Sequence, residues 1–259
     1  MTIDDVVRRR QYLTAMEIEI WERRSIGAAA VPAPGESVAS DFNGRDSGAA
    51  ALMPPRPANA PVTSVKPQTG MPFAVPALDW QALEQVVAGC SKCSLHAHRT
   101  QTVFGVGNKT AQWLFIGEAP GAEEDRQGEP FVGRAGQLLN AMLLAIGLKR
   151  QEIYIANVLK CRPPNNRDPQ GIEVECCEPY LLRQIDLIAP KIIIAMGRFA
   201  AHSLMKTDMA LGKLRGRRLA YHGIPLIVTY HPAYLLRNPI DKRKAWEDLC
   251  LAKTVMEDS

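Results

Sequence analysis

The sequence predicts an α/β domain in which helices cover a parallel sheet. Three observations lead to this fold class. Short apolar runs rich in β-branched residues recur in the second half of the chain, as they do in strands buried on both faces. Longer segments with helical periodicity separate these runs. The residues that follow each run are polar and turn-rich, as at the carboxyl edge of such a sheet, where sites are built.

Each element of this fold can be placed along the chain. The predicted strands are residues 111–120, 152–161, 191–197 and 224–232. The predicted helices are residues 135–148, 171–189, 198–205 and 245–255. The strands end in the sequences GEAPG, NVLKCRPP, MGR and HPAYLLRNP. We expect the active site to be assembled from these four segments.

The chain of 259 residues divides into three zones. Residues 1–24 carry apolar side chains at helical spacing, which predicts either a short amphipathic helix that needs a partner surface or a poorly folded terminus. Residues 25–76 are rich in Ala, Pro, Gly and Ser, which predicts a disordered linker. Residues 77–259 form the predicted folded domain.

Composition excludes some classes of protein. Hydrophobic residues make up 46% and charged residues 22% of the chain, which is typical of a globular protein. The net charge of +4 is too small to indicate nucleic-acid binding by itself. No apolar run approaches the ~18 residues needed to span a membrane. The chain starts MTIDDVVRRR, without an apolar signal core, so we expect a cytoplasmic protein with no membrane partner.

Six cysteines in a cytoplasmic chain indicate free or metal-bound thiols rather than disulfides. Cys90 and Cys93 form a C-x-x-C pair, and Cys161 and Cys177 follow at a distance. Such a set can hold zinc or an iron–sulfur cluster, and the spacing leaves both open. Cys176 precedes Cys177, and neighbouring side chains on a helix point in different directions. Only one of these two should therefore be a ligand.

Three motifs, taken with these cysteines, resemble the iron–sulfur uracil-DNA glycosylases of family four. The motifs are GEAPGAEEDRQGEPFVGRAGQLL, NVLKCRPPNNRDP and HPAYLLRNP, and the resemblance covers residues 77–257. It implies a three-layer α/β/α sandwich with a four-stranded parallel sheet. It also implies a 4Fe-4S cluster on Cys90, Cys93, Cys161 and Cys177. The implied activity is excision of uracil from single- or double-stranded DNA by base flipping and hydrolysis of the N-glycosidic bond, which starts base excision repair.

The resemblance also implies roles for three residues that contact the base. His231 matches the histidine that hydrogen-bonds uracil O2. Asn157 matches the residue that recognises the uracil edge. A carboxamide suits this role because it can donate to O4 and accept from N3–H. Phe131 matches the aromatic residue that stacks on the flipped base.

The motif that contains Gly117 and Glu118 is harder to interpret. The best-known glycosylase family has an aspartate that orients the attacking water at the position of Ala119, so the water has no obvious partner here. Glu118 is a candidate for that role, either through its side chain or only through its backbone. We expect Gly117, Glu118 and Glu124 to contact uracil, with Glu124 as a candidate wall against the thymine methyl group.

Contacts to DNA are expected from two of the motifs. Leu235, Leu236 and Arg237 match a segment that enters the duplex beside the vacated base, where apolar wedges hold a kinked step open. Arg162 and Arg167 are candidates for phosphate contacts, which are salt-sensitive and independent of sequence. The basic run KLRGRR is a further candidate, or a solvated loop.

Two other functional classes fit parts of the pattern. One is a non-enzymatic iron–sulfur module for DNA binding or replication, and the other is a zinc-stapled hydrolase of another kind. The segment RRRQYLTAMEIEIWERR loosely resembles the N-terminal segment of the psi subunit of the bacterial replicative polymerase complex. This suggests that residues 1–24 dock on a replication or repair protein. We expect the glycosylase itself to act as a monomer.

Overall fold

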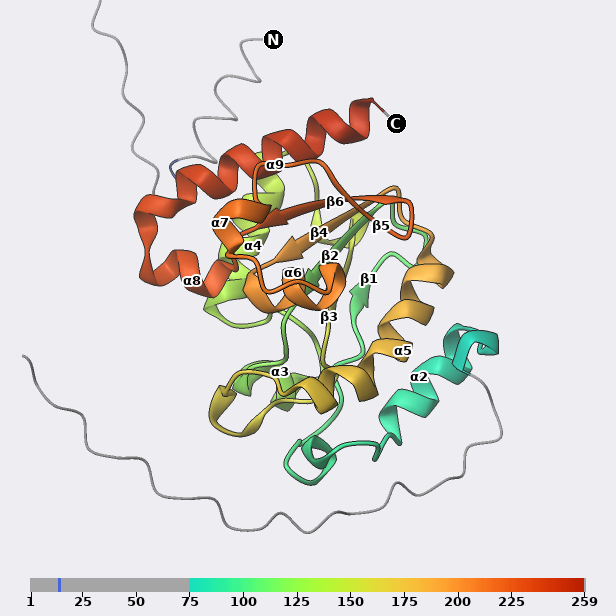
Figure 1. Ribbon diagram of the computed structural model, residues 1–259. Coiled ribbons are helices and arrows are strands. Elements are labelled where there is room, and N and C mark those ends of the chain that lie inside the picture. Colours follow the sequence, from blue (N-terminus) through green and yellow to red (C-terminus); the bar gives the residue numbers. More distant parts are fainter. Residues whose placement is uncertain (1–13, 15–74, 259) are drawn as a thin grey trace, which may run out of the picture. The chain divides into compact units, whose positions relative to one another are not determined.

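The computed structural model describes Thr14 and residues 75–258 of the chain (Figure 1). Thr14 is helical and exposed. The rest of the predicted segment 1–24, and the predicted linker up to residue 74, lie outside the described residues. A short 3-10 helix, η1 (Val75–Ala77), is the first element described after Thr14.

One mixed sheet forms the centre of the domain, with the strand order β1-β3-β2-β4-β6-β5. The strands are β1 (Val106–Gly107), β2 (Trp113–Gly117), β3 (Tyr154–Asn157), β4 (Ile192–Met196), β5 (Leu219–Tyr221) and β6 (Ile224–Thr229). The four inner strands are parallel to one another, as predicted. The sheet is wider than predicted because β1 and β5 pair antiparallel with its outer strands. These edge strands are too short to show a periodic pattern.

Helices cover both faces of this sheet and produce three layers (Figure 1). One face packs against α4 (Arg134–Ala145), α8 (Pro232–Arg237) and α9 (Lys242–Glu257). The other packs against α5 (Gly171–Ile188), α6 (Arg198–Met205) and α7 (Leu211–Leu214). Alternate strand residues serve the two cores: Phe115 lies in the first and Ile116 in the second. The predicted α/β/α sandwich is therefore confirmed.

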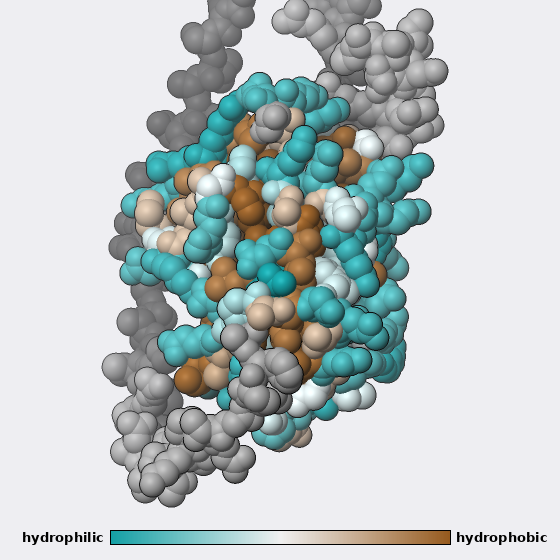
Figure 2. All heavy atoms as spheres, turned by 90° about the vertical axis from the view of Figure 1, so that its right-hand side faces the viewer, coloured by the Kyte–Doolittle hydropathy of each residue, from teal (hydrophilic) through white to brown (hydrophobic). Residues whose placement is uncertain are grey.

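A further helix, α2 (Trp80–Ala88), extends the layer of α5. Asp79 caps it by accepting a hydrogen bond from the backbone N–H of Ala82 at 2.8 Å. Trp80 packs edge-on against the rings of Phe104 and Tyr154, with centroids 5.4 and 5.3 Å away. Figure 2 views the molecule from this side and shows hydrophilic side chains over most of the face, with a band of hydrophobic residues between them.

The parallel register brings the carboxyl ends of the inner strands to one edge of the sheet. Gly117 pairs with Asn157, and Met196 pairs with Thr229. The loops after these residues, with the short helix α3 (Ala122–Gln127), therefore meet there. None of the helices in the described part of the chain is long and apolar enough to cross a membrane.

Candidate active site

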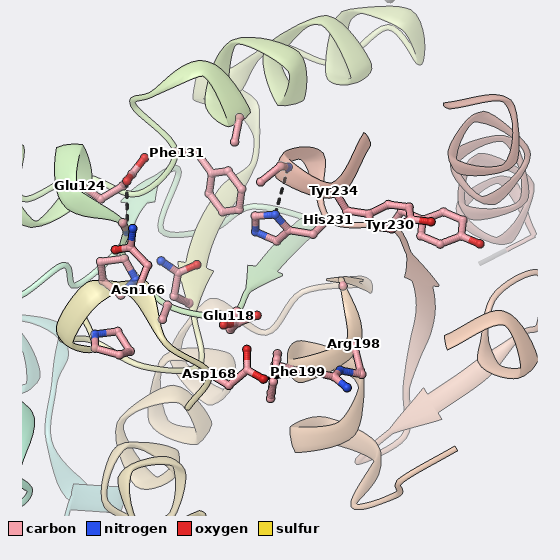
Figure 3. Close-up of a pocket in the computed structure, with 18 of the residues that line it drawn as sticks. Glu118, Glu124, Phe131, Asn166, Asp168, Arg198, Phe199, Tyr230, His231 and Tyr234 are labelled. Atoms are coloured by element: carbon pink, nitrogen blue, oxygen red, sulfur yellow. Dashed lines mark hydrogen bonds and ion pairs between the residues drawn. The ribbon is translucent and has the colours of Figure 1, made fainter. Parts of the chain in front are cut away.

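A cavity of about 690 Å³ opens at this carboxyl edge. The segments that follow β2, β3, β4 and β6 all contribute to its lining, as predicted. Of the predicted site residues, it is lined by Glu118, Glu124, Phe131, Asn157, Arg167, His231 and Arg237. Figure 3 shows Phe131 and His231 at one end of this pocket and Glu118, Asp168 and Arg198 at the other. We call the part of the pocket around Glu118, Asp168 and Arg198 its charged end.

His231 caps α8 and holds one defined tautomer. Its Nδ1 accepts a hydrogen bond from the backbone N–H of Ala233 at 3.1 Å, so Nδ1 carries no proton. Burial, with Arg237 acting in the same direction and Glu124 against it, lowers the pKa of His231 to about 4. The ring is thus neutral at physiological pH. Its single proton is on Nε2, which can donate to a bound ligand.

Phe131 and Asn157 can lie together because Gly117 has no side chain. A Cβ atom at Gly117 would lie 2.8 Å from Cζ of Phe131 and closer still to Oδ1 of Asn157. The ring of Phe131 lies 5.4 Å from that of His231, tilted by 31°. Gly117 therefore makes room for the predicted contact residues.

Asn157 is 2% exposed, and its Oδ1 has no hydrogen-bond partner in the described part of the chain. A buried acceptor without a partner costs free energy unless a ligand or water satisfies it. Phe131 has a backbone φ of 56°, which is uncommon for a residue with a side chain. Strained backbone of this kind is frequent at functional sites.

Glu118 lies at the charged end of the pocket. Burial, and to a smaller extent the neighbouring Asp168, raises the pKa of Glu118 to about 7, whereas Arg198 acts in the opposite direction. Arg198 forms an ion pair with Asp168 at 3.3 Å. A carboxyl group with this pKa can change its protonation state near neutral pH, which suits a proton acceptor.

Glu124 has a structural role in addition to the predicted pocket wall. One carboxylate oxygen accepts from the backbone N–H of Gly121 at 3.1 Å, and the other from Val132 at 3.1 Å and Gly133 at 3.2 Å. These bonds tie the start of α3 to the loop that carries Phe131. Glu124 lines the pocket, but its oxygens hold the backbone on both sides of the aromatic residue.

The predicted apolar wedge is only partly compatible with the structure. Leu235 is 1% exposed and belongs to the core shared with α4 and α9, so it does not face the surface. The reason is that α8 is helical, which places Leu235 one turn after the buried Pro232 on the same face. Leu236 is partly buried and packs against the same core. Arg237 is exposed at the rim of the pocket.

Three of the other predicted phosphate contacts have partners within the protein. Arg167 lines the pocket, but it forms a two-pronged ion pair with Glu173, whose side chain is fully buried. Arg162 lies outside the pocket lining and donates to Oδ1 of Asn166 at 2.8 Å. In the run KLRGRR, Arg215 pairs with the buried Asp248 at 3.0 Å. Each of these arginines therefore has a structural contact of its own.

Five cysteines line a second, smaller cavity: Cys90, Cys93, Cys161, Cys176 and Cys177. Cys161 and Cys177 are buried, each 3% exposed. Burial raises the pKa of Cys177 to about 12. Thiols in such surroundings ionise when a metal supplies positive charge. In the described residues, no compact group of three or more His, Cys, Asp or Glu side chains has the geometry of a single-ion site.

The donors around these thiols fit an iron–sulfur cluster. Arg99 donates from Nη1 to Sγ of Cys161 at 3.1 Å, and the hydroxyl of Tyr180 donates to Sγ of Cys90 at 3.4 Å. Hydrogen bonds to cysteine sulfur are a common means of tuning such clusters. Cys176 instead points its thiol to the backbone carbonyl of Lys92 at 3.4 Å. The predicted set of four thiols is thus compatible with a cluster ligand set, and Cys176 has a different contact.

Several residues in and between these cavities escaped the sequence analysis. Asp168, Arg198, Tyr230 and Tyr234 line the pocket, and the two tyrosine rings stack with centroids 5.0 Å apart. Asp168 lies within the quoted segment NVLKCRPPNNRDP and Arg198 within MGR, so both could have been found by their position. Lys160 was also missed. Its side chain is buried, which lowers its pKa to about 7, and nothing in its sequence context indicates that burial.

Comparison with known proteins agrees with this geometry. The family model of the Uracil DNA glycosylase superfamily matches residues 104–251. A type-4 uracil-DNA glycosylase of Archaeoglobus fulgidus is 47% identical over 161 residues, covering 59% of this chain and 81% of that relative. One from Pyrobaculum aerophilum is 43% identical over 182 residues, covering 67% and 93%. One from Thermotoga maritima is 41% identical over 181 residues, covering 68% and 94%. The chain belongs to the type-4 uracil-DNA glycosylases of the Uracil DNA glycosylase superfamily.

Proposed function

We propose that this chain excises uracil from DNA at the pocket between Phe131, Asn157 and His231. The reaction is hydrolysis of the bond between the base and deoxyribose, without covalent attachment to the protein, and it begins the repair of the lesion. Family membership decides against the two other classes, a non-enzymatic module and an unrelated zinc hydrolase. The observation that carries the assignment of the pocket is the buried Oδ1 of Asn157, which has no hydrogen-bond partner among the described residues.

Three pocket residues contact different parts of the flipped base. Uracil leaves the stack and enters against the ring of Phe131. The carboxamide of Asn157 accepts from N3–H and donates to O4. Nε2–H of His231 donates to O2 and stabilises the negative charge that develops on the departing base, which is where fixed donors contribute most. Cytosine presents an acceptor at N3 and a donor at N4, so it meets the carboxamide with the pattern reversed.

Glu118 is our candidate for orienting the attacking water. It lies at the charged end of the pocket, away from Phe131 and His231 (Figure 3). A carboxylate at this place can accept a proton from water as the sugar becomes positively charged. Arg237, exposed at the rim, is our candidate for a contact to the DNA phosphates.

We assign the cysteine cavity to a 4Fe-4S cluster held by Cys90, Cys93, Cys161 and Cys177. These cysteines lie in the segment after α2, in the loop after β3 and in α5, so a bound cluster would link these three parts of the chain. The donors from Arg99 and Tyr180 support this assignment. No step of uracil excision is assigned to the cluster.

The experiment that tests the pocket replaces the side-chain amide nitrogen of Asn157 by an oxygen atom. Asn157→Asp replaces the donor to O4 by a carboxylate, which repels the departing anion. Excision of uracil from an oligonucleotide, measured as released base, should fall by about 100-fold or more. Slight activity on cytosine should appear. Asn140→Asp, on α4 outside the pocket lining, is the matched control and should keep the parental rate. An unchanged rate for Asn157→Asp removes this residue from uracil recognition.

We further propose that residues 1–24 recruit the glycosylase, which acts as a monomer, to a replication or repair protein. The amphipathic pattern around Trp21 supports docking into a groove, and the predicted linker, residues 25–76, would raise the local enzyme concentration as a tether. A chain that begins at residue 77 should excise uracil from free DNA at the full rate and lose co-purification with the partner. Slower excision from free DNA would assign the segment to the enzyme itself.

A further inference from the structure

A buried lysine lies between the two cavities. Lys160 is 1% exposed and lines the cysteine cavity. Its Nζ donates to the backbone carbonyl of Asn157 at 2.9 Å and to Oε1 of Gln184 at 2.6 Å. Gln184 is itself fully buried and donates to the carbonyl of Phe104 at 3.0 Å. The lysine head group is therefore fixed in position by two acceptors, and both of them are neutral.

Neutral acceptors do not balance the charge of a buried ammonium group. Taking such a group out of water is costly unless an opposite charge lies nearby. The ion pairs found among the described residues include none with Lys160. The groups near it that can become negative are the thiols of Cys161 and Cys177, which line the same cavity. Among the described residues, an ammonium group at this place is therefore balanced when the cysteine site carries negative charge.

We propose that Lys160 is the counter-ion of the cluster-binding cysteines and a positioning residue for Asn157. This inference rests on the proposed function. Four thiolates with a 4Fe-4S cluster carry net negative charge, which the ammonium group of Lys160 balances from inside the protein. The same ammonium group holds the carbonyl of Asn157, whose side chain reads uracil. Charge in the cysteine site and geometry in the uracil pocket are thereby linked through one side chain.

Two substitutions separate the charge of this residue from its shape. Lys160→Met keeps an unbranched apolar chain of similar length and removes the charge. Lys160→Arg keeps the charge in a larger head group. Lys242→Met is the matched control, because Lys242 is also buried, at 5% exposure, but begins α9 and does not line the cysteine cavity.

The primary measurement is the midpoint potential of the cluster in the full-length protein, titrated with reductant and followed by electron paramagnetic resonance. Removing a nearby positive charge makes addition of an electron harder. Lys160→Met should therefore shift the potential to more negative values or lower the cluster content per chain. Lys160→Arg and Lys242→Met should remain at the potential and cluster content of the unaltered protein.

Uracil excision supplies the second readout. Lys160→Met should raise KM for a uracil oligonucleotide several-fold more than it lowers kcat, because the position of the Asn157 side chain is disturbed. The proposal is overturned if Lys160→Met keeps a full cluster at the unaltered potential. If Lys160→Met does not fold, a Lys160→Arg variant that folds and holds the cluster supports a role of the positive charge. If neither variant folds, the shape of the side chain alone matters, and the proposal is overturned.

The unaltered protein shows separately whether the underlying function holds. Its visible absorbance reports the cluster, and its release of uracil reports the glycosylase. Failure of either is a failure of the proposed function. If the protein holds the cluster and excises uracil, but the midpoint potential does not depend on Lys160, only this inference fails.

Discussion

The uracil pocket and the cysteine cavity adjoin one short segment, residues 157–161, but they are built in opposite ways. The pocket is about 690 Å³ and keeps the buried Oδ1 of Asn157 without a partner in the described part of the chain. In the cysteine cavity, sulfur atoms already accept hydrogen bonds from Arg99 and Tyr180. A site for a passing ligand keeps polar atoms unpaired, whereas a site for a resident group surrounds its ligands with donors.

The largest effect should follow from breaking the cysteine site. Cys161→Ser should lose the yellow-brown absorbance and more than about 4 kcal/mol of unfolding free energy, because loss of a structural metal site is among the most damaging changes. Absorbance and thermal unfolding of the purified protein are the measurements.

Matched controls come from the chain itself. Cys176→Ser, in the same cavity, and Cys250→Ser, on α9, should stay coloured and stable. A colourless Cys176→Ser together with a brown Cys177→Ser would reverse the ligand assignment.

The next effect concerns space in the uracil pocket. Gly117→Ala places a methyl group against Oδ1 of Asn157 and the ring of Phe131, so both must move. Misplacement of this size should lower kcat/KM for uracil excision by about 100-fold. Colour should be retained, since the change lies in the other cavity.

Gly212→Ala is the control for the loss of a glycine, because a Cβ there meets nothing within 4 Å. It should keep the parental kcat/KM. A fully active Gly117→Ala would mean that uracil does not use the space between Asn157 and Phe131.

The smallest effect concerns the charged end of the pocket. Since the pKa of Glu118 is raised to about 7, its carboxyl is protonated below that pH and ionised above it. If the carboxylate orients water, kcat rises with pH through about 7. His231, with its pKa lowered to about 4, cannot cause this rise.

Glu118→Gln should remove the rise and lower kcat at pH 8 by about 10-fold, the value of one hydrogen bond in the transition state. The measurement is a profile of kcat against pH for both proteins. A profile of the same shape in both would exclude the Glu118 side chain from the water step.

The inner sheet and most of the pocket could be predicted from sequence because long apolar runs and motif positions are local signals. Orientation was harder to predict. The motif predicts that Leu235 is an exposed wedge, but the helical path of α8 places it in the core. Glu124 lines the pocket, but the sequence does not indicate that its partners are backbone amides up to nine residues away. The burial of Lys160 depends on Gln184, which is distant in sequence, so no local pattern could reveal it.

The most direct test of the account is a crystal structure of the protein soaked with uracil. The account predicts that the base stacks on Phe131, with N3 and O4 within about 3.2 Å of the carboxamide of Asn157 and O2 at the same range from Nε2 of His231. Uracil bound elsewhere, or in this pocket with Oδ1 of Asn157 still unpartnered, would contradict it.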